Sequence, residues 1–497
     1  MQDNHSKFRT FLWPIYGMEH KKFLPMTFMI ALILFNYTIL RNMKDTLVIT
    51  ATSGSDVIVF LKSWGVLPSA ILFFFIYSKL SNVLRRQTLF YVSVSFFLAY
   101  FALFALVLYP NQNLIHPHQS ADWLINHLPA GFKSFVNIYK YWSFSLFYIL
   151  AELWGSVVSA LLFWQLANSI VKVSEAKRFY AHFYLLANLA TALSGIISTY
   201  FSKKGTHIED PIASYGITVN YLLWTVVGCG LVVMLLYYYL DKRVIPDPKL
   251  VDPQESSSTK KKLKLSISES IKFILHSKYL GWIVLLVICY GISINLVEVA
   301  WKNQVGLFLP NPSDKQAFFG NYSAVSGIST VAVILIGGSL MRWLGWKVAA
   351  LLTPIVIGLT GSLFFYFMIF EKSASVLVTG LGTTALAFAV YMGALQVILS
   401  KSTKYALFDP TKEMTYIPLD EESKVKGKAA VDVVGGRFGK AGGAFLQQAM
   451  LIFIGPMTVI APFSALLMIL FVVIWIVAVY KLHILFKAAG GEKAWNE

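Results

Sequence analysis

The chain has 497 residues, of which 57% are apolar and only 13% carry a charge. Ordinary soluble proteins carry about 25% charged residues, so this composition excludes a soluble globular fold. The formal net charge of +17 does not indicate a nucleic-acid partner, because the basic residues gather on one side of the predicted membrane topology, where they face anionic lipid. Cys229 and Cys289 are the only cysteines, which excludes a disulfide framework and a cysteine-based metal cluster.

Long apolar stretches follow one another along almost the whole sequence. A hydrocarbon core about 30 Å thick is crossed by about 20 residues of helix, whereas a transmembrane β-barrel would show alternating segments of about ten residues. The sequence therefore predicts an all-α polytopic membrane protein with twelve transmembrane helices. In chain order the predicted spans are 24–40, 57–77, 89–109, 144–171, 180–201, 217–240, 279–300, 319–340, 348–370, 376–400, 429–454 and 459–480.

Lysine and arginine concentrate in the N-terminal tail and in the connections that follow the even-numbered spans. Because cytoplasmic loops carry the excess of basic residues, both termini are predicted to be cytoplasmic. The segment Met1 to Lys22 has no small-residue cleavage site and is not a cleavable signal peptide. A bacterial cytoplasmic (inner) membrane is the simplest predicted location.

The longest connection, residues 241–278, separates spans six and seven. It divides the chain into an N-terminal six-helix half, 1–240, and a C-terminal six-helix half, 279–497. Within the connection, Ser266 and Glu269 form a capping box, which predicts an amphipathic helix on the cytoplasmic surface. A 6+6 arrangement with both ends inside is the plan of major-facilitator-like transporters, whose substrate site lies near the bilayer midplane between the halves.

Several ionisable residues lie in or next to the predicted spans. A charge at bilayer depth costs at least about 2.5–3.5 kcal/mol, so each is a candidate for function. In a facilitator-like bundle they fall on helices that line or flank the central cavity, and their excess of cations predicts a nucleotide-sized polyanion as the ligand. The candidate substrate-binding residues are Arg41 and Lys44 at the end of span one, Glu152 in span four, Glu298 and Lys302 at the end of span seven, and Arg437 and Lys440 in span eleven.

An alternative is that these residues form structural ion pairs, with Glu152 paired to Lys440 and Arg437 to Asp432. Lys62, one turn into span two, is expected to extend to the membrane surface. The segment GGRFGKAGG is not a phosphate-binding P-loop, because that motif requires glycine at 434 and Ser or Thr at 441, where this chain has valine and alanine. Its glycines are expected to permit close helix packing. We find no metal-ligand set, no cofactor motif and no nucleophile–base pair, so the sequence predicts a transporter rather than an enzyme.

Long motifs in nearly every part of the chain resemble those of the ATP/ADP translocase (nucleotide transporter) family of obligate intracellular bacteria and plastids. The resemblance implies twelve helices, a facilitator-like fold, and exchange of external ATP for internal ADP. The motifs are NYTILRNMKDTLVIT, FLKSWGVLPSA, AELWGSVVSALLFWQLAN, EAKRFYAHFYLLANLA, NLVEVAWK and KYALFDPTKEMTYIPLDEESKVKGKAAVDVVGGRFGKAGGA.

In that family, charged residues matching Lys44, Glu152, Glu298 and Lys440 are implicated in transport. Arg41 and Arg437 are added from charge and spacing alone. ATP, ADP and the lipid bilayer are the expected partners, with inorganic phosphate as a candidate co-substrate and a monomer as the expected state. The alternative is a proton-coupled nucleotide or NAD symporter of the same fold, in which Glu152 or Glu298 would titrate.

Overall fold

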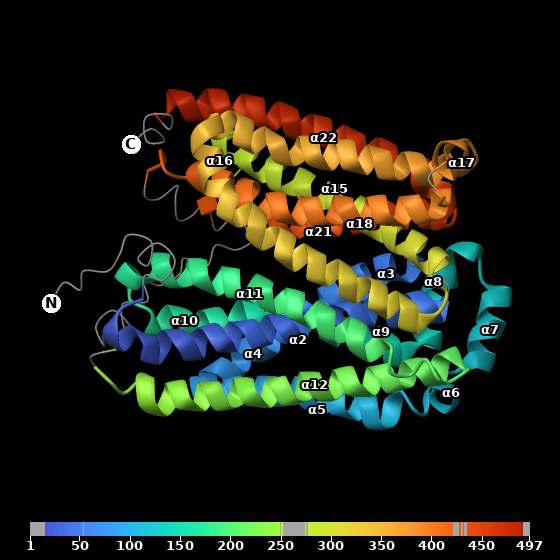
Figure 1. Ribbon diagram of the computed structural model, residues 1–497, viewed down its shortest axis with the longest axis horizontal. Helices are drawn as coiled ribbons and strands as arrows, with labels where there is room; N and C mark the ends of the chain where they lie inside the picture. The colour runs from blue at the N-terminus through green and yellow to red at the C-terminus, as the bar shows by residue number, and fades with distance from the viewer. Residues whose placement is uncertain are drawn as a thin grey trace.

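The computed structural model describes residues 15–490, apart from 53, 249, 252–273, 275–276, 381, 421–426, 429–430 and 432–434. The described residues form helices and turns, with no strand among them (Figure 1). Eleven of these helical segments are long and apolar enough to cross a membrane, and a shorter apolar helix, Ala441–Phe453, lies in the eleventh predicted span. This confirms the all-α polytopic class, while the count of twelve spans stays a prediction. The predicted amphipathic helix after Ser266 lies outside the described residues.

The N-terminal half is a bundle in which the second and fourth predicted spans are each interrupted by a π-helical stretch. The sequence pattern did not predict these stretches, because the apolar run continues through them. The main helical segments of this half are α2 (His20–Thr52), α3 (Asp56–Phe60), η2 (Leu61–Val66), α4 (Leu67–Val83), α5 (Arg86–Leu103), η3 (Phe104–Leu108), α9 (Trp142–Trp154), η5 (Gly155–Phe163), α10 (Trp164–Ile170), α11 (Val173–Ser202), α12 (Pro211–Tyr239) and η6 (Leu240–Val244). Further helices are η1 (Gly17–Glu19), α6 (Gln112–Ile115), α7 (His118–His127), η4 (Ala130–Phe132) and α8 (Lys133–Lys140).

The C-terminal half forms a second bundle. Its spans eight and nine are continuous in α16 except at Gly345, whose φ of 73° belongs to the left-handed region that glycine adopts without strain. The helices of this half are α15 (Lys278–Phe308), α16 (Pro312–Ile369), α17 (Glu371–Thr379), α18 (Ala385–Thr403), η7 (Lys404–Phe408), α19 (Asp409–Met414), α21 (Gly436–Phe453) and α22 (Met457–Ala488).

The predicted tenth span, 376–400, begins too early. Its first residues belong to the separate short helix α17, and the long helix α18 begins only at Ala385. Gly382, between these two helices, has a φ of 69°, a left-handed backbone conformation that a regular α-helix does not contain. The Thr384 hydroxyl then accepts a hydrogen bond of 3.1 Å from the Ala387 amide and caps the new helix. At its other end the helical path continues beyond residue 400 through η7 and α19.

Figure 1 shows the two bundles one above the other, with α16 leaning across to α11. The beginning of α2 and the end of α22 lie at the same end of the molecule. Large apolar side chains such as Phe75, Leu235 and Leu466 remain exposed on the outer faces of the helices. An apolar exterior around a packed interior is the arrangement that a lipid environment favours.

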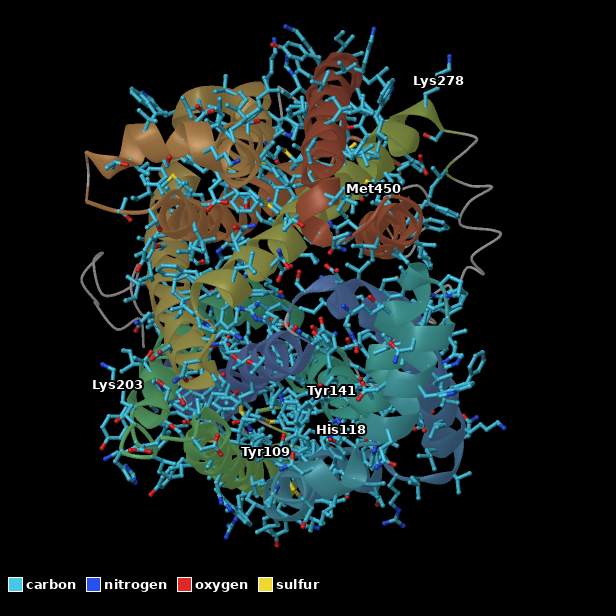
Figure 2. All side chains as sticks on the ribbon, turned by 90° about the vertical axis from the view of Figure 1, so that its right-hand side faces the viewer. Tyr109, His118, Tyr141, Lys203, Lys278 and Met450 are labelled. Atoms are coloured by element: carbon cyan, nitrogen blue, oxygen red, sulfur yellow. The ribbon has the colours of Figure 1, made fainter. Side chains whose placement is uncertain are left out.

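The two halves are joined at the end of the molecule away from the start of α2 and the end of α22 (Figure 1). There the Asn42 amide of α2 donates to the Ser323 hydroxyl of α16 at 2.9 Å. At the same end the Ser214 and Ser313 hydroxyls lie 3.5 Å apart. Figure 2 looks onto this end and shows Tyr109, His118 and Tyr141 together in the N-terminal half.

Backbone-to-backbone packing of α11 against α16 closes the same end. A Cβ added at Gly195 would lie 2.3 Å from the Gly320 carbonyl oxygen, and one added at Gly327 would lie 2.6 Å from the Asn188 carbonyl oxygen. Only glycine permits this approach, which is how helices pack closely in membranes. The molecule is therefore held in a state in which this end is closed.

Candidate functional site

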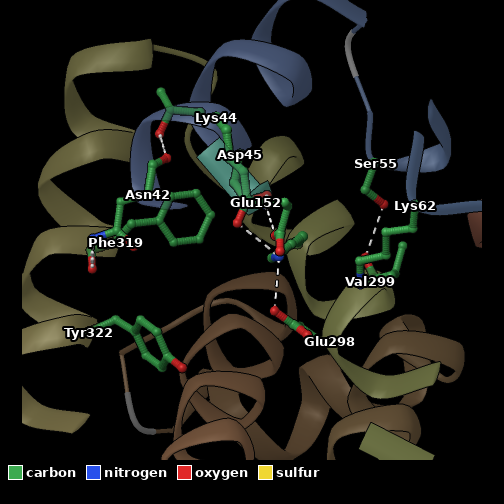
Figure 3. Close-up of polar contacts among 12 residues, drawn as sticks. Asn42, Lys44, Asp45, Ser55, Lys62, Glu152, Glu298, Val299, Phe319 and Tyr322 are labelled. Carbon is green, nitrogen blue, oxygen red and sulfur yellow. Dashed lines mark hydrogen bonds and ion pairs between the residues drawn. The ribbon is translucent and has the colours of Figure 1, made fainter. Parts of the chain in front are cut away.

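A chain of alternating charges runs between the two halves (Figure 3). Lys44 Nζ lies 2.8 Å from Asp45 Oδ1 and 3.0 Å from Glu152 Oε1. Lys302 Nζ lies 2.8 Å from Asp45 Oδ2 and 2.9 Å from Glu298 Oε1. The order of groups is thus Glu152, Lys44, Asp45, Lys302, Glu298, and we call these five residues the ion chain.

Three helices supply the ion chain. Lys44 and Asp45 lie in the C-terminal part of α2, and Glu152 lies in α9, so these three belong to the N-terminal half. Glu298 and Lys302 lie four residues apart in α15, which places both side chains on one face of that helix in the C-terminal half. The Lys302–Asp45 ion pair is therefore the link of the chain that crosses from one half to the other.

The middle of the ion chain is buried and its ends are not. The side chains of Lys44, Asp45 and Lys302 are 0%, 5% and 4% exposed, whereas those of Glu152 and Glu298 are 24% and 27% exposed. Buried charges are tolerated only when they are paired, and here Asp45 serves both lysines. The Lys44 ammonium also lies 3.8 Å from the centre of the Tyr148 ring, a cation–π contact.

Three further cations near the ion chain make no ion pair with a described residue. Lys62 Nζ donates to Asn295 Oδ1 at 2.9 Å, and Lys401 Nζ donates to the Tyr322 hydroxyl at 2.5 Å. Arg41, one turn before Lys44 on α2, lies within electrostatic reach of Tyr322 and Glu298. Together with the two lysines of the ion chain these give five cations against three carboxylates, an excess of two positive charges in the described centre.

The structure brings together Lys44, Glu152, Glu298 and Lys302, four of the residues selected from the sequence, and places Arg41 beside them. Glu152 pairs with Lys44. The alternative of structural ion pairs expected Lys440 as the partner of Glu152. The expectation for Lys62 was wrong, because its ammonium is directed at Asn295 of α15 rather than at the membrane surface.

Arg437 and Lys440 lie on α21, but their side chains are outside the described part of the structure, as is Asp432. Their proposed contacts therefore stay predictions. The backbone of α21 packs closely on α15, since a Cβ at Gly291 would lie 2.6 Å from the Gly439 carbonyl carbon. This confirms that the glycines around Lys440 serve close helix packing, and it places α21 beside the helix that carries Glu298 and Lys302.

Asp45, Lys401 and Tyr322 were not selected from the sequence. Asp45 follows Lys44 directly in the chain, so it resembled the local partner of that lysine, and its second contact, to Lys302, depends on the tertiary structure. Lys401 follows the predicted end of span ten, where a lysine is expected to mark the cytoplasmic side of the membrane. A helical path continuing beyond residue 400 would have been the signal that identifies it.

The fold of the described residues is similar to that of several solved membrane transporters. A bacterial homologue of the iron transporter ferroportin gives a TM-score of 0.58 at 14% identity and covers 94% of this chain and 99% of its own. A D-xylose–proton symporter gives a TM-score of 0.57 at 12% identity over 94% and 97% of the two chains. The chain therefore shares the fold of these solved membrane proteins, and its charged centre lies between its two helical bundles.

Sequence comparison then identifies the family. The TLC ATP/ADP transporter family matches residues 1–486. The ADP,ATP carrier protein 1 of Chlamydia trachomatis is 47% identical over 489 residues, which is 98% of this chain and 93% of that protein. That of Rickettsia bellii is 44% identical over 97% and 96% of the two chains. The chloroplastic ADP,ATP carrier protein 1 of Arabidopsis thaliana is 44% identical over 96% of this chain and 76% of its own length. The chain belongs to the TLC ATP/ADP transporter family.

Proposed function

We propose that this protein exchanges ATP for ADP across a membrane by alternating access, with the nucleotide phosphates bound at the charged centre between the two halves. The observation that carries the proposal is the ion chain itself, which crosses from one half to the other through Lys302 and Asp45. Membership of the family and the names of its relatives in Chlamydia and Rickettsia support ATP and ADP as the substrates.

The charge balance of the centre favours a polyanion. Five cations outnumber three carboxylates among the described groups. Arg437 and Lys440, which we also assign to the site, belong to α21, the helix that packs on α15. Charged hydrogen bonds from lysine and arginine are strong and suit phosphate oxygens. The carboxylates of Glu152 and Glu298, at the exposed ends of the ion chain, neutralise Lys44 and Lys302.

This arrangement explains why exchange would be obligatory. To open the closed end, the carrier must part the buried ion pair between Asp45 and Lys302 and separate charges that compensate one another. Removing one partner of a buried pair is strongly unfavourable, by about 3–5 kcal/mol. A bound nucleotide supplies negative charge to the cations of the centre when this pair separates, so the loaded carrier reorients and the empty carrier does not.

We also propose that both termini are cytoplasmic, so that the closed end of the described state faces outward. ATP carries one more negative charge than ADP, and exchange moves that charge unless phosphate or another ion accompanies it. At about 2.3 kcal/mol per charge per 100 mV, the membrane potential would then influence the direction of net exchange.

Uptake of labelled ATP, ADP, GTP, UTP, CTP and NAD into cells expressing the protein tests this function. We expect ATP and ADP to enter, and preloaded counter-substrate to accelerate their entry. Uptake that follows an imposed proton gradient and ignores preloading would instead favour the symporter. The Lys440→Ala variant tests the site: full ATP exchange in this variant would remove Lys440 from it.

A further inference from the structure

Arg41 and Lys401 bring two positive charges together at the boundary between the halves. Arg41 lies on α2 of the N-terminal half and Lys401 on α18 of the C-terminal half. They are close enough for each charge to act on the other, and both side chains are only partly buried. Two cations close to each other in a membrane protein are unfavourable unless an anion lies near them.

Neither cation forms an ion pair with a carboxylate in the described part of the chain. The acids that influence both are Asp45 and Glu298. Asp45 is bonded to Lys44 and Lys302, and Glu298 is bonded to Lys302. The ion chain thus holds its own acids, and no carboxylate of the described residues pairs with Arg41 or Lys401.

Tyr322 of α16 holds the ammonium of Lys401 in place. Its hydroxyl accepts a hydrogen bond from Lys401 Nζ at 2.5 Å, and the Lys401 ammonium lies 4.9 Å from the centre of its ring. The Tyr322 ring lies 5.0 Å from that of Trp301, whose indole donates to the Val390 carbonyl oxygen at 2.9 Å. Figure 3 shows Tyr322 reaching from α16 toward the side of the ion chain where Glu298 lies.

Accessibility separates these cations from those of the ion chain. Lys44 and Lys302 are buried, and each contacts two carboxylates that would repel an approaching phosphate. Arg41 and Lys401 are partly exposed and bind no acid among the described residues. An incoming anion is therefore attracted first to Arg41 and Lys401.

We propose that Arg41 and Lys401, with the Tyr322 hydroxyl, form a phosphate-binding subsite that joins the two halves through the nucleotide. The inference rests on the proposed function and assigns the polyphosphate to particular donors. The guanidinium supplies two parallel N–H donors and the ammonium a compact charge. A phosphate held by one cation from each half stabilises the approach of the halves, while the ion chain remains an internal link.

The test uses the full-length protein in proteoliposomes preloaded with ADP. The external concentrations of ATP and ADP that give half-maximal exchange, and that of AMP that gives half-maximal inhibition, are measured for Lys401→Gln, Arg41→Gln and the double variant. We expect each single change to raise the value for ATP roughly tenfold, since each removes a charged hydrogen bond to phosphate. The increase in this concentration should be smallest for AMP and largest for ATP. The double variant should lose less affinity than the product of the two single losses, because both cations bind the same phosphate group.

Lys372→Gln removes an exposed cation of α17, and it serves as the matched control, for which the measured concentrations should not change. Lys401→Arg should recover most of the affinity. Should a glutamine variant fail to fold, Tyr322→Phe keeps the ring and removes only the hydroxyl, and a severalfold increase for ATP is expected. Wild-type exchange with unchanged half-saturating concentrations in the folded variants would overturn the subsite. Absence of nucleotide exchange in the wild-type protein would overturn the proposed function instead.

Discussion

At the scale of single residues, Asp45 holds the centre together. Its two carboxylate oxygens accept separately from Lys44 and Lys302, so one side chain neutralises two buried ammonium groups and joins the halves. Glu152 and Glu298 each reach only one of these lysines. The ends of the ion chain are therefore free to respond to a ligand, whereas its middle is fixed by Asp45.

Asp45→Asn is expected to destabilise the protein and to slow exchange strongly. The amide keeps the shape of the side chain but removes the charge, which leaves two buried lysines near each other with less compensation; breaking such buried pairs costs about 3–5 kcal/mol. Thermal unfolding of the purified variant in detergent and ADP-driven exchange in proteoliposomes measure both effects.

The matched control for this variant is Asp122→Asn. Asp122 also pairs with a lysine, Lys140, at 2.6 Å, but its side chain is 58% exposed. Exposed ion pairs contribute about 0–1 kcal/mol, so the control should retain its unfolding temperature and its exchange rate. Equal behaviour of the two variants would show that Asp45 does not have the role we assign to it.

The sequence predicts the residues of the centre only in part, for a physical reason. Lys44, Glu152, Glu298 and Lys302 could be selected because a charge is conspicuous in or next to an apolar run. Which of them pair depends on the faces that α2, α9 and α15 present to one another, and a linear pattern does not contain that information. Lys401 was overlooked because an apolar run that stops at residue 400 does not indicate where the helix stops.

At the scale of elements, the segment between α5 and α9 is fixed to the N-terminal half by His116. Its side chain is buried, its Nε2 lies 2.7 Å from the Ser143 hydroxyl, and its ring packs edge-on against Phe144 with the centroids 4.9 Å apart. Burial, with a smaller effect from the neighbouring His118, lowers the pKa of His116 from its ordinary value of 6.5 to about 4.

This shift predicts a pH-dependent stability. Between pH 6.5 and about 4 the unfolded chain binds a proton at His116 that the folded protein does not, so the contribution is complete above pH 6.5 and is lost as the pH falls toward 4. Unfolding temperatures measured in detergent across this range should fall more steeply for the wild type than for His116→Gln. Parallel curves for the two proteins would contradict this role of His116.

The presence of each membrane-spanning helix was easier to predict from the sequence than the residues at which it begins and ends. Apolar runs of about 20 residues identify spans reliably because the bilayer requires them. The break before Ala385 depends on a backbone conformation at Gly382, and the π-helical stretch Gly155–Phe163 leaves no mark in hydropathy. Both features alter which residues face the centre, so boundary errors become errors in the site.

At the scale of the whole molecule, the described state is closed at one end by polar contacts and by glycine-mediated packing of α11 on α16. Alternating access requires these contacts to separate once in every cycle. The same end carries the link between Asp45 and Lys302, so opening it and disrupting the ion chain are parts of one movement.

A disulfide across the closed end should stop transport. Ser214 and Ser313 come from opposite halves with their hydroxyls 3.5 Å apart, and Ser214→Cys/Ser313→Cys replaces both with side chains of similar size. Oxidation is expected to abolish exchange, and reduction to restore it, because the halves can no longer separate there. ADP-driven exchange before and after treatment with oxidant and reductant is the measurement.

The control pair lies within one half. Thr330 and Ser402 have hydroxyls 3.4 Å apart, both in the C-terminal bundle, so Thr330→Cys/Ser402→Cys places a comparable link where no separation is required. Exchange by this pair should survive oxidation. If the oxidised Ser214/Ser313 pair also continued to exchange, the halves would not part at this end during transport.

Release of labelled ATP from proteoliposomes containing the full-length protein tests the account most directly. With no nucleotide outside, the vesicles should retain ATP, because the empty carrier cannot reorient with its buried lysines and carboxylates uncompensated. External ADP should start rapid release, and an imposed proton gradient alone should not. Release that proceeds without external nucleotide, or that follows the proton gradient and ignores ADP, would contradict obligatory exchange through this charged centre.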